Sequence, residues 1–144
     1  MKRALLLMVF TLLFGGCSKN IKQTSQPSIE EMTQYDYDVI KEKIINWNDL
    51  FSVEKDNYNA YIYSKTCVHC NEIKQDIISY GLNHDNFYFI EYNKSIPVSE
   101  SVDATIGKNN VEEISILGTP TLLTIENGIL IKNIAGGKAI LEAI

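Results

Sequence analysis

The chain has 144 residues, 45% of them hydrophobic and 22% charged, which is the size and composition of one folded domain with a hydrophobic core and excludes a chain that is disordered throughout. The formal net charge is −5, and without residues 1–16 it is −7, from 11 basic and 18 acidic side chains. This surplus of acidic groups argues against nucleic acid as a partner.

Residues 1–16, MKRALLLMVFTLLFGG, predict an export signal peptide, because a basic start precedes an apolar run and small residues. The run is too short for a membrane span, since a helix needs roughly 20 apolar residues to cross about 30 Å of hydrocarbon. The following Cys17 completes Leu-Phe-Gly-Gly-Cys, which resembles the lipobox of bacterial lipoproteins and implies acylation of Cys17. The alternative is an ordinary signal peptide that leaves Cys17 as a free thiol.

Residues 17–35 are polar and lack apolar periodicity, which predicts a flexible tether, or a disordered terminus without that role. We expect one domain over residues 36–144. At its start, apolar residues from Tyr37 to Phe51 recur at helical intervals, which predicts one α-helix with Trp47 packed in the core.

The next segments predict a strand, a helix and a second strand. Residues 58–64, YNAYIYS, and 87–92, FYFIEY, are rich in aromatic and β-branched residues and predict strands whose tyrosines belong to the sheet and core. The helix between them has one apolar face, and we expect Gly81 to end it in a left-handed conformation. That face consists of Cys70, Ile73, Ile77 and Tyr80.

Residues 98–113 predict a further helix. Residues 121–134 predict a β-hairpin, because Asn127-Gly128 between two β-type runs favours a two-residue turn. Gly136-Gly137 is expected to end the second of these strands, which leaves room for a short last helix. This order predicts an α/β fold with a central mixed β-sheet and helices on both faces.

Cys67 and Cys70, in KTCVHCNEIK, are the candidate reactive residues. Structural zinc needs four ligands, and the domain adds only His69 and His84 to the two thiols, so we expect no metal. A purely structural disulfide is disfavoured, because so short a loop constrains the unfolded chain very little. Their place at a helix start favours the thiolate of Cys67, and a protonated His69 would add to this. The alternative for His69 is an exposed helical residue without such a role.

The combination of these motifs resembles the thioredoxin fold and its disulfide oxidoreductases, over roughly residues 36–144. It consists of a strand, then Cys67-Val68-His69-Cys70 opening a helix, then GTPT at 118–121 before a hairpin. The resemblance implies that Cys67 attacks, that Cys70 resolves the mixed disulfide, and that Val68 and His69 tune the pair. It also implies a cis Thr119-Pro120 bond at the substrate site, and no cofactor besides the redox-active cysteine pair.

Together with the lipobox, the resemblance implies a thiol-disulfide oxidoreductase that is lipid-anchored to the outer face of a bacterial cell membrane. Its expected partners are cysteine-containing exported proteins or peptides and a redox partner that recycles it. The histidine resembles that of DsbA-type oxidants and favours an oxidising couple, with a reductase as the alternative. A non-enzymatic surface lipoprotein that binds a peptide as an accessory factor for secretion is the rival of another class.

Two features depart from the family pattern. Tyr61 stands where members often carry a buried acid that assists proton transfer to the resolving thiol, and Glu72 or water is the candidate substitute. The last helix is also shorter than usual.

Overall fold

The computed structural model describes residues 35–144. The predicted signal peptide, Cys17 and all but the last residue of the predicted tether lie outside the described residues. Within residues 35–144, no helix is long and apolar enough to cross a membrane.

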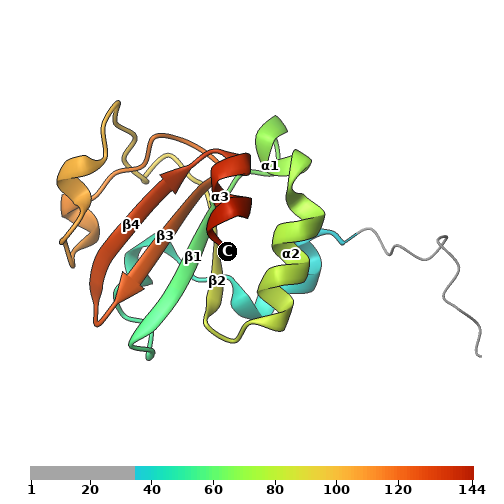
Figure 1. The fold of residues 1–144 in the computed structure, drawn as a ribbon, viewed down its shortest axis with the longest axis horizontal. Helices are drawn as coiled ribbons and strands as arrows, with labels where there is room; N and C mark the ends of the chain where they lie inside the picture. The colour runs from blue at the N-terminus through green and yellow to red at the C-terminus, as the bar shows by residue number, and fades with distance from the viewer. Residues whose placement is uncertain (1–34) are drawn as a thin grey trace, which may run out of the picture. The chain divides into compact units, whose positions relative to one another are not determined.

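A mixed four-stranded sheet with the strand order β2-β1-β3-β4 forms the centre of the domain (Figure 1). The strands are β1 (Asn57–Tyr63), β2 (Phe87–Glu91), β3 (Thr121–Glu126) and β4 (Ile129–Ala135). β1 runs parallel to β2 and antiparallel to β3, which forms a hairpin with β4. Positive φ angles at Asn127 (50°) and Gly128 (74°) give the tight hairpin turn that the sequence predicts.

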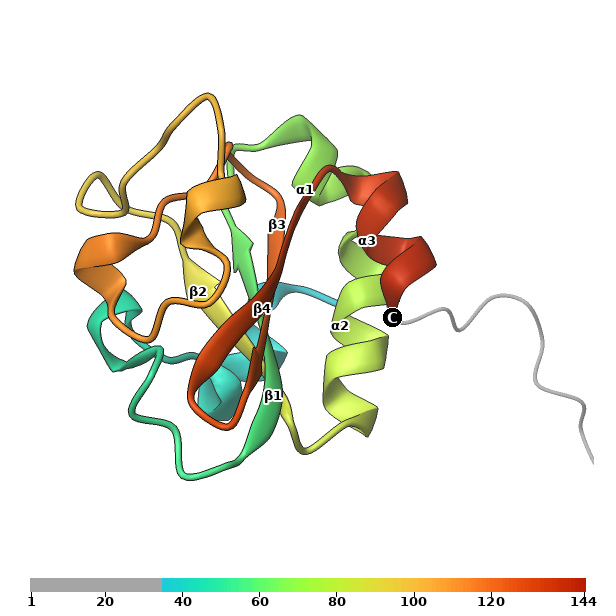
Figure 2. The same cartoon turned by 60° about the vertical axis from the view of Figure 1, so that its left-hand side comes forward.

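One face of the sheet is covered by three α-helices and a 3-10 helix (Figures 1 and 2). These elements are η1 (Tyr37–Lys43), α1 (Val68–Glu72), α2 (Lys74–Asn83) and α3 (Gly137–Ala143). The core on this face contains the buried aromatic residues Tyr37, Tyr61, Tyr63, Phe87 and Phe89 together with Cys70. The buried thiol therefore lies among phenol rings.

The other face is covered by short 3-10 helices and the long connection from β2 to β3. The 3-10 helices are η2 (Trp47–Asp49), η3 (Asp103–Thr105) and η4 (Val111–Glu113). Trp47 packs in the core on this side, as predicted, with Leu50 and Ile116. The predicted α/β class with a central mixed sheet is confirmed, and the topology is that of the thioredoxin fold.

The predicted single helix from Tyr37 to Phe51 is wrong. The segment forms η1 and η2 with an extended stretch between them. In that stretch Ile44 makes a parallel bridge to Phe89, and the Ile45 N–H donates to the Phe89 carbonyl at 2.9 Å. Pairing with the edge of β2 uses backbone groups that a continuous helix would need for itself.

The predicted helix over 98–113 is also wrong, because the backbone there pairs with β4. The Gly107 N–H donates to the Leu130 carbonyl at 2.8 Å, and the Leu130 N–H donates to the Lys108 carbonyl at 2.8 Å. Gly107 has φ 86°, which a helix interior does not allow. Only the single turns η3 and η4 remain.

The helix after β1 is divided at Ile73, whose φ and ψ of −107° and 5° separate α1 from α2. Gly81 does not end α2 but lies buried inside it, so its predicted role is wrong. A Cβ atom on Gly81 would lie 2.5 Å from Cζ of Phe89. Glycine is therefore needed there because α2 approaches the sheet closely.

Candidate functional site

Cys67 is the N-terminal cap of α1. Its backbone is extended, and its Sγ accepts a hydrogen bond from the Cys70 N–H at 3.2 Å. The first N–H groups of a helix lack partners within the helix, and side-chain oxygens usually fill this role. Here the sulfur of a partly exposed cysteine takes it, which favours a negative charge on that sulfur.

Cys70 lies one helical turn further on and is 0% exposed. Both cysteines are free thiols in this structure. The predicted apolar face is confirmed at Cys70, Ile73 and Ile77, which are all buried, and Tyr80 packs against the same core while partly exposed. The pair thus consists of a partly exposed sulfur, that of Cys67, and a buried sulfur, that of Cys70.

The two thiols differ in acidity. Partial burial acts to raise the pKa of Cys67, but hydrogen bonds from the side chains of Cys70 and Thr119 and from nearby backbone N–H groups outweigh it and lower this pKa below its ordinary value. Burial raises the pKa of Cys70 to about 11, and its hydrogen bond to Cys67 acts in the same direction. Cys67 is therefore the better nucleophile near neutral pH.

The loop before β3 lies against this sulfur. The Thr119-Pro120 peptide bond is cis, as the resemblance implies, and the Cys67 thiol donates to the Thr119 carbonyl at 3.2 Å. The Thr121 hydroxyl donates to the Gly118 carbonyl at 2.6 Å and holds the loop from the other side. The structure thus brings the Thr119-Pro120 loop together with Cys67 and Cys70, although the loop lies 49 residues or more after the two cysteines in the sequence.

Val68 and His69 lie on the surface of α1. Val68 is 68% exposed, and Nδ1 of His69 lies 3.1 Å from Oε2 of Glu72, with both of those side chains exposed. The backbone N–H of His69 is among the groups that lower the pKa of Cys67. Tuning by the His69 imidazole and by Val68 stays a prediction.

Tyr61 occupies the place of the expected acid and is 0% exposed. Burial raises its pKa, and the neighbouring Cys70 raises it further, so this phenol stays neutral. Glu72 is at the surface, paired with His69, and not beside the buried thiol. Glu72 therefore does not take the place of the expected acid, and the group next to Cys70 is the phenol of Tyr61.

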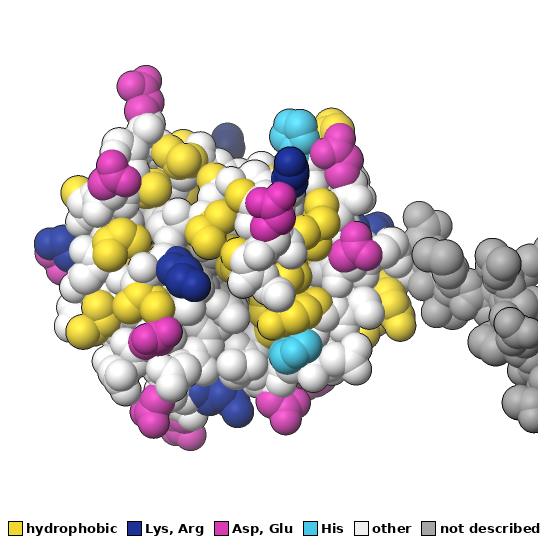
Figure 3. Space-filling view, in the orientation of Figure 1, with side chains coloured by type: hydrophobic (Ala, Val, Ile, Leu, Met, Phe, Trp, Pro, Cys, Tyr) yellow, Lys and Arg dark blue, Asp and Glu magenta, His cyan; other side chains and the backbone are white. Residues whose placement is uncertain are grey.

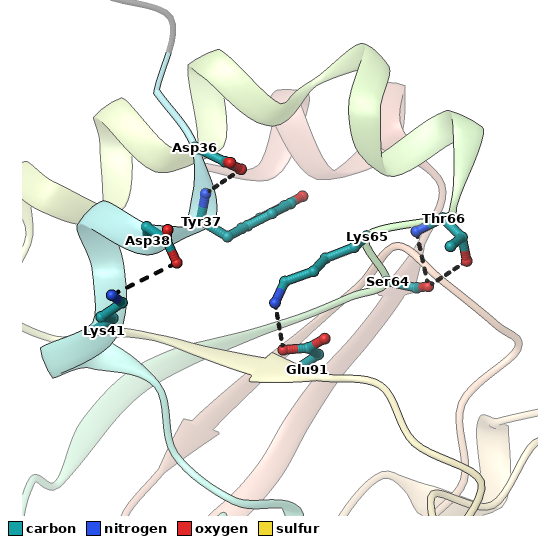
Figure 4. A network of polar contacts seen from close by, with 8 residues as sticks. All are labelled: Asp36, Tyr37, Asp38, Lys41, Ser64, Lys65, Thr66 and Glu91. Atoms are coloured by element: carbon teal, nitrogen blue, oxygen red, sulfur yellow. Dashed lines mark hydrogen bonds and ion pairs between the residues drawn. The ribbon is translucent and has the colours of Figure 1, made fainter.

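The segment from β1 to Cys67 is fixed by polar contacts (Figure 4). Nζ of Lys65 lies 3.3 Å from Oε2 of Glu91, and the hydroxyls of Ser64 and Thr66 lie 3.1 Å apart (Figure 4). The Cys67 N–H donates to the Ser64 carbonyl at 3.1 Å. The Tyr37 side chain extends along the inner side of the helices toward Ser64 and Thr66 (Figure 4). Sequence reasoning missed Tyr37 as a neighbour of the site, because nothing local connects it with a motif 30 residues away.

A groove of about 590 Å³ adjoins the site between α1 and α3, with His69, Glu72 and Lys138 among its lining residues. The Gly136 N–H donates to the Pro120 carbonyl at 3.0 Å, which connects the start of α3 with the cis-proline loop. Gly136-Gly137 was expected only to end a strand, so this contact was missed. Charged side chains of both signs and apolar side chains share this surface (Figure 3).

Among residues 35–144, no group of three or more His, Cys, Asp or Glu side chains is placed to hold a metal ion. The reactive groups that the structure brings together are the two thiols.

No protein-family model matches the chain, and no curated protein matches its sequence. Solved thioredoxin structures are similar to it. Mitochondrial thioredoxin 3 from Saccharomyces cerevisiae has a TM-score of 0.47 and 16% identity, over 75% of this chain and 95% of that chain. Plasmodium falciparum thioredoxin has a TM-score of 0.46 and 15% identity, over 70% of this chain and 94% of that chain. Spinach chloroplast thioredoxin f has a TM-score of 0.46 and 14% identity, over 74% of this chain and 87% of that chain. The thioredoxin fold of this chain is defined by its own strand order, cysteine pair and cis-proline loop.

Proposed function

We propose that this chain is a thiol-disulfide oxidoreductase that exchanges disulfides with cysteine-containing proteins or peptides through Cys67 and Cys70. The observation that carries the proposal is the difference between the two thiols. Cys67 is partly exposed and has a lowered pKa, whereas Cys70 is buried and has a pKa of about 11. An attacking and a resolving thiol need these two environments.

In the reducing direction, the Cys67 thiolate attacks one sulfur of a substrate disulfide. The substrate S–S bond breaks, its second sulfur leaves as a thiolate and takes up a proton, and a mixed disulfide with Cys67 forms. Cys70 then loses its proton and attacks Sγ of Cys67, which releases the remaining substrate sulfur as a thiol. The substrate disulfide gains two electrons, and the cysteine pair is oxidised to a disulfide.

The same steps run backwards oxidise a substrate dithiol, so the redox potential decides the direction. Related cysteine motifs cover about −270 to −120 mV, and 30 mV corresponds to about 1.4 kcal/mol for two electrons. We propose an oxidising couple on account of His69. Equilibration of the cysteine pair with glutathione buffers tests this, and a potential near −270 mV would instead indicate a reductase.

We further propose that the domain acts outside the cytoplasm, held at a bacterial cell membrane by acylated Cys17, and is recycled by a redox partner. The lipobox-like sequence before Cys17 supports this proposal. Metabolic labelling with palmitate in a bacterial host should mark the wild-type chain and not Cys17→Ser. An unlabelled wild-type chain would contradict the anchor.

Cysteine variants of the full chain test the activity. Cys67→Ala should abolish reduction of a disulfide-containing protein such as insulin, and Cys70→Ala should accumulate a mixed disulfide on non-reducing gels. Cys17→Ser is the matched control and should keep activity in solution, because it removes a cysteine outside the pair. If Cys67→Ala and Cys70→Ala both complement a deletion strain, the chain acts by binding a peptide and not by thiol exchange.

A further inference from the structure

Tyr61 and Cys70 meet in the core although they come from different elements. Tyr61 lies on β1 and Cys70 on α1, both are 0% exposed, and both belong to the same buried cluster. Tyr63 stands on the same face of the sheet, because side chains two residues apart on a strand point the same way. The face below the cysteine pair therefore carries two phenols from β1 and a third, Tyr37, from η1.

All three phenol hydroxyls are buried without a hydrogen-bond partner among the described residues. A buried hydroxyl without a partner is costly and uncommon, and so needs an explanation. Burial raises the pKa of each, but their neighbours differ. Both thiols affect Tyr61 and Tyr37, whereas Tyr63 is affected by Glu91, Asp36 and Asp38. The pKa values of Tyr61 and Tyr37 thus depend on the cysteines, whereas that of Tyr63 depends on carboxylates.

The lack of a hydrogen-bond partner for the Tyr61 hydroxyl is consistent with the reduced state of the cysteine pair, which is the state in this structure. In the dithiol, Cys70 keeps its proton and its thiol hydrogen-bonds to the Cys67 sulfur. Once Cys67 is bonded to a substrate sulfur, it is no longer an anion, and Cys70 must ionise in a buried place. The Tyr61 hydroxyl, which has no partner in the reduced state, can then donate a hydrogen bond to the new Cys70 thiolate. An interaction formed only as the reaction proceeds increases its rate.

We propose that Tyr61 is the positioning residue of the resolving step, and that its hydroxyl donates a hydrogen bond to the Cys70 sulfur as that sulfur ionises and attacks Cys67. The Cys70–Cys67 bond forms while the bond from Cys67 to the substrate sulfur breaks. The proton of Cys70 passes to the departing substrate sulfur, and Tyr61 keeps its own proton. This inference rests on the proposed function and assigns a residue to one of its two steps.

Reaction of the reduced full chain with dithiobis(nitrobenzoate), an aromatic disulfide, separates the two steps. Every sample carries Cys17→Ser, so that only the pair reacts. Attack by Cys67 releases one coloured thiolate, and resolution by Cys70 releases the second. In Tyr61→Phe we expect an unchanged first phase and a second phase about three- to tenfold slower. A hydrogen bond to a charged group changes the thiolate pKa by about one to two units, partly offset by the higher nucleophilicity of the more basic thiolate.

Tyr63→Phe is the matched control, because it removes a hydroxyl that is also buried without a partner but whose pKa neither thiol affects. Both of its phases should equal those of the parent chain. The pH profile of the second phase adds a readout that altered packing alone would not move. It should shift upward by about one unit in Tyr61→Phe. Among the other groups near Cys70, Thr119 does not titrate, and Cys67 is held in the mixed disulfide during this phase. Tyr37 is the other phenol whose pKa the thiols affect, so Tyr37→Phe measures its contribution to the second phase.

The outcomes separate the inference from the function on which it rests. A second phase in Tyr61→Phe equal to that in Tyr63→Phe, or an equal slowing of both phases, would overturn the role of Tyr61. A parent chain that releases only one coloured thiolate would overturn the oxidoreductase itself, whatever Tyr61 does.

Discussion

The sulfur of Cys67 accepts a hydrogen bond from the backbone N–H of Cys70 at 3.2 Å, so the candidate nucleophile caps the helix that carries its own resolving partner. The contact keeps the two cysteines at the start of the same short helix. It also lowers the pKa of Cys67, because a backbone N–H stabilises the thiolate more than the thiol. One interaction therefore contributes to both the geometry and the reactivity of the pair.

Alkylation should distinguish the two cysteines. Because the pKa of Cys67 is lowered and that of Cys70 is raised to about 11, iodoacetamide should label Cys67 with a pH midpoint below that of free cysteine. Cys70 should stay unlabelled over the same range. Peptide mass spectrometry of the full chain at a series of pH values measures both. A Cys67 midpoint at or above that of free cysteine would contradict the proposed nucleophile.

Gly81→Ala should destabilise the domain. The added Cβ would lie 2.5 Å from Cζ of Phe89, and overpacking costs about 1–3 kcal/mol, against a gain in helix propensity of about 1 kcal/mol. We therefore expect a net loss of up to about 2 kcal/mol in the free energy of unfolding, measured in urea. Ser79→Ala in the same helix is the control and should be neutral or slightly stabilising. Equal stability of the two variants would show that α2 can move away from the sheet.

Tyr63→Phe should stabilise the domain by about 1 kcal/mol. Its hydroxyl is buried with no partner among the described residues, so the variant removes a desolvated polar group and keeps the ring. The ring stacks on Tyr37 at 3.9 Å between centroids, and this packing is retained. Urea unfolding of the full chain measures the change. A loss of stability would mean that the hydroxyl is hydrogen-bonded in solution.

The reduced protein should lose stability in alkali. The pKa of Cys70 is raised from 9.0 to about 11, so the folded state holds this proton more tightly than the unfolded state. The stabilisation is fully present below pH 9.0 and is lost as the pH rises through about 11. Cys67 has the opposite sign, since its lowered pKa gives a stabilisation that is present in alkali and lost as the pH falls.

Urea unfolding of the reduced wild type and of Cys70→Ala across this pH range measures the effect. Cys70 also lowers the pKa of Cys67, so the difference between the two curves reports on the Cys70 thiol together with its effect on Cys67. Parallel curves would show that the Cys70 thiol is not desolvated.

Local chemistry made part of the fold predictable. The Asn127-Gly128 turn supplies the positive φ angles that the hairpin needs, and the abundance of aromatic and β-branched residues marks β1 and β2. The cysteine pair was predictable as a short motif, and the cis bond before Pro120 only as what the resemblance to a known fold implies. Their meeting could be expected only through the resemblance to a known fold.

Elements that depend on long-range pairing were not predictable. The 3.6-residue pattern around Ile44 is overridden by its bridge to Phe89, and Gly107 is held by a strand that comes later in the chain. Gly81 was misread because its environment comes from β2 and not from its neighbours in sequence. Similarly, the resemblance identifies Tyr61 as standing in the place of an acid, but only the packed core shows that its hydroxyl is buried without a partner and near Cys70.

The hydrogen bond from Gly136 to the carbonyl of Pro120 has a genetic consequence. A nonsense mutation just after Ala135 would spare the codons of all four strands, yet it would delete this contact and the buried Ile140. The truncated product would keep both cysteines while losing one support of the loop beside them and the apolar cover of Ile73. Loss of function from such an allele would therefore leave every residue of the cysteine motif unchanged.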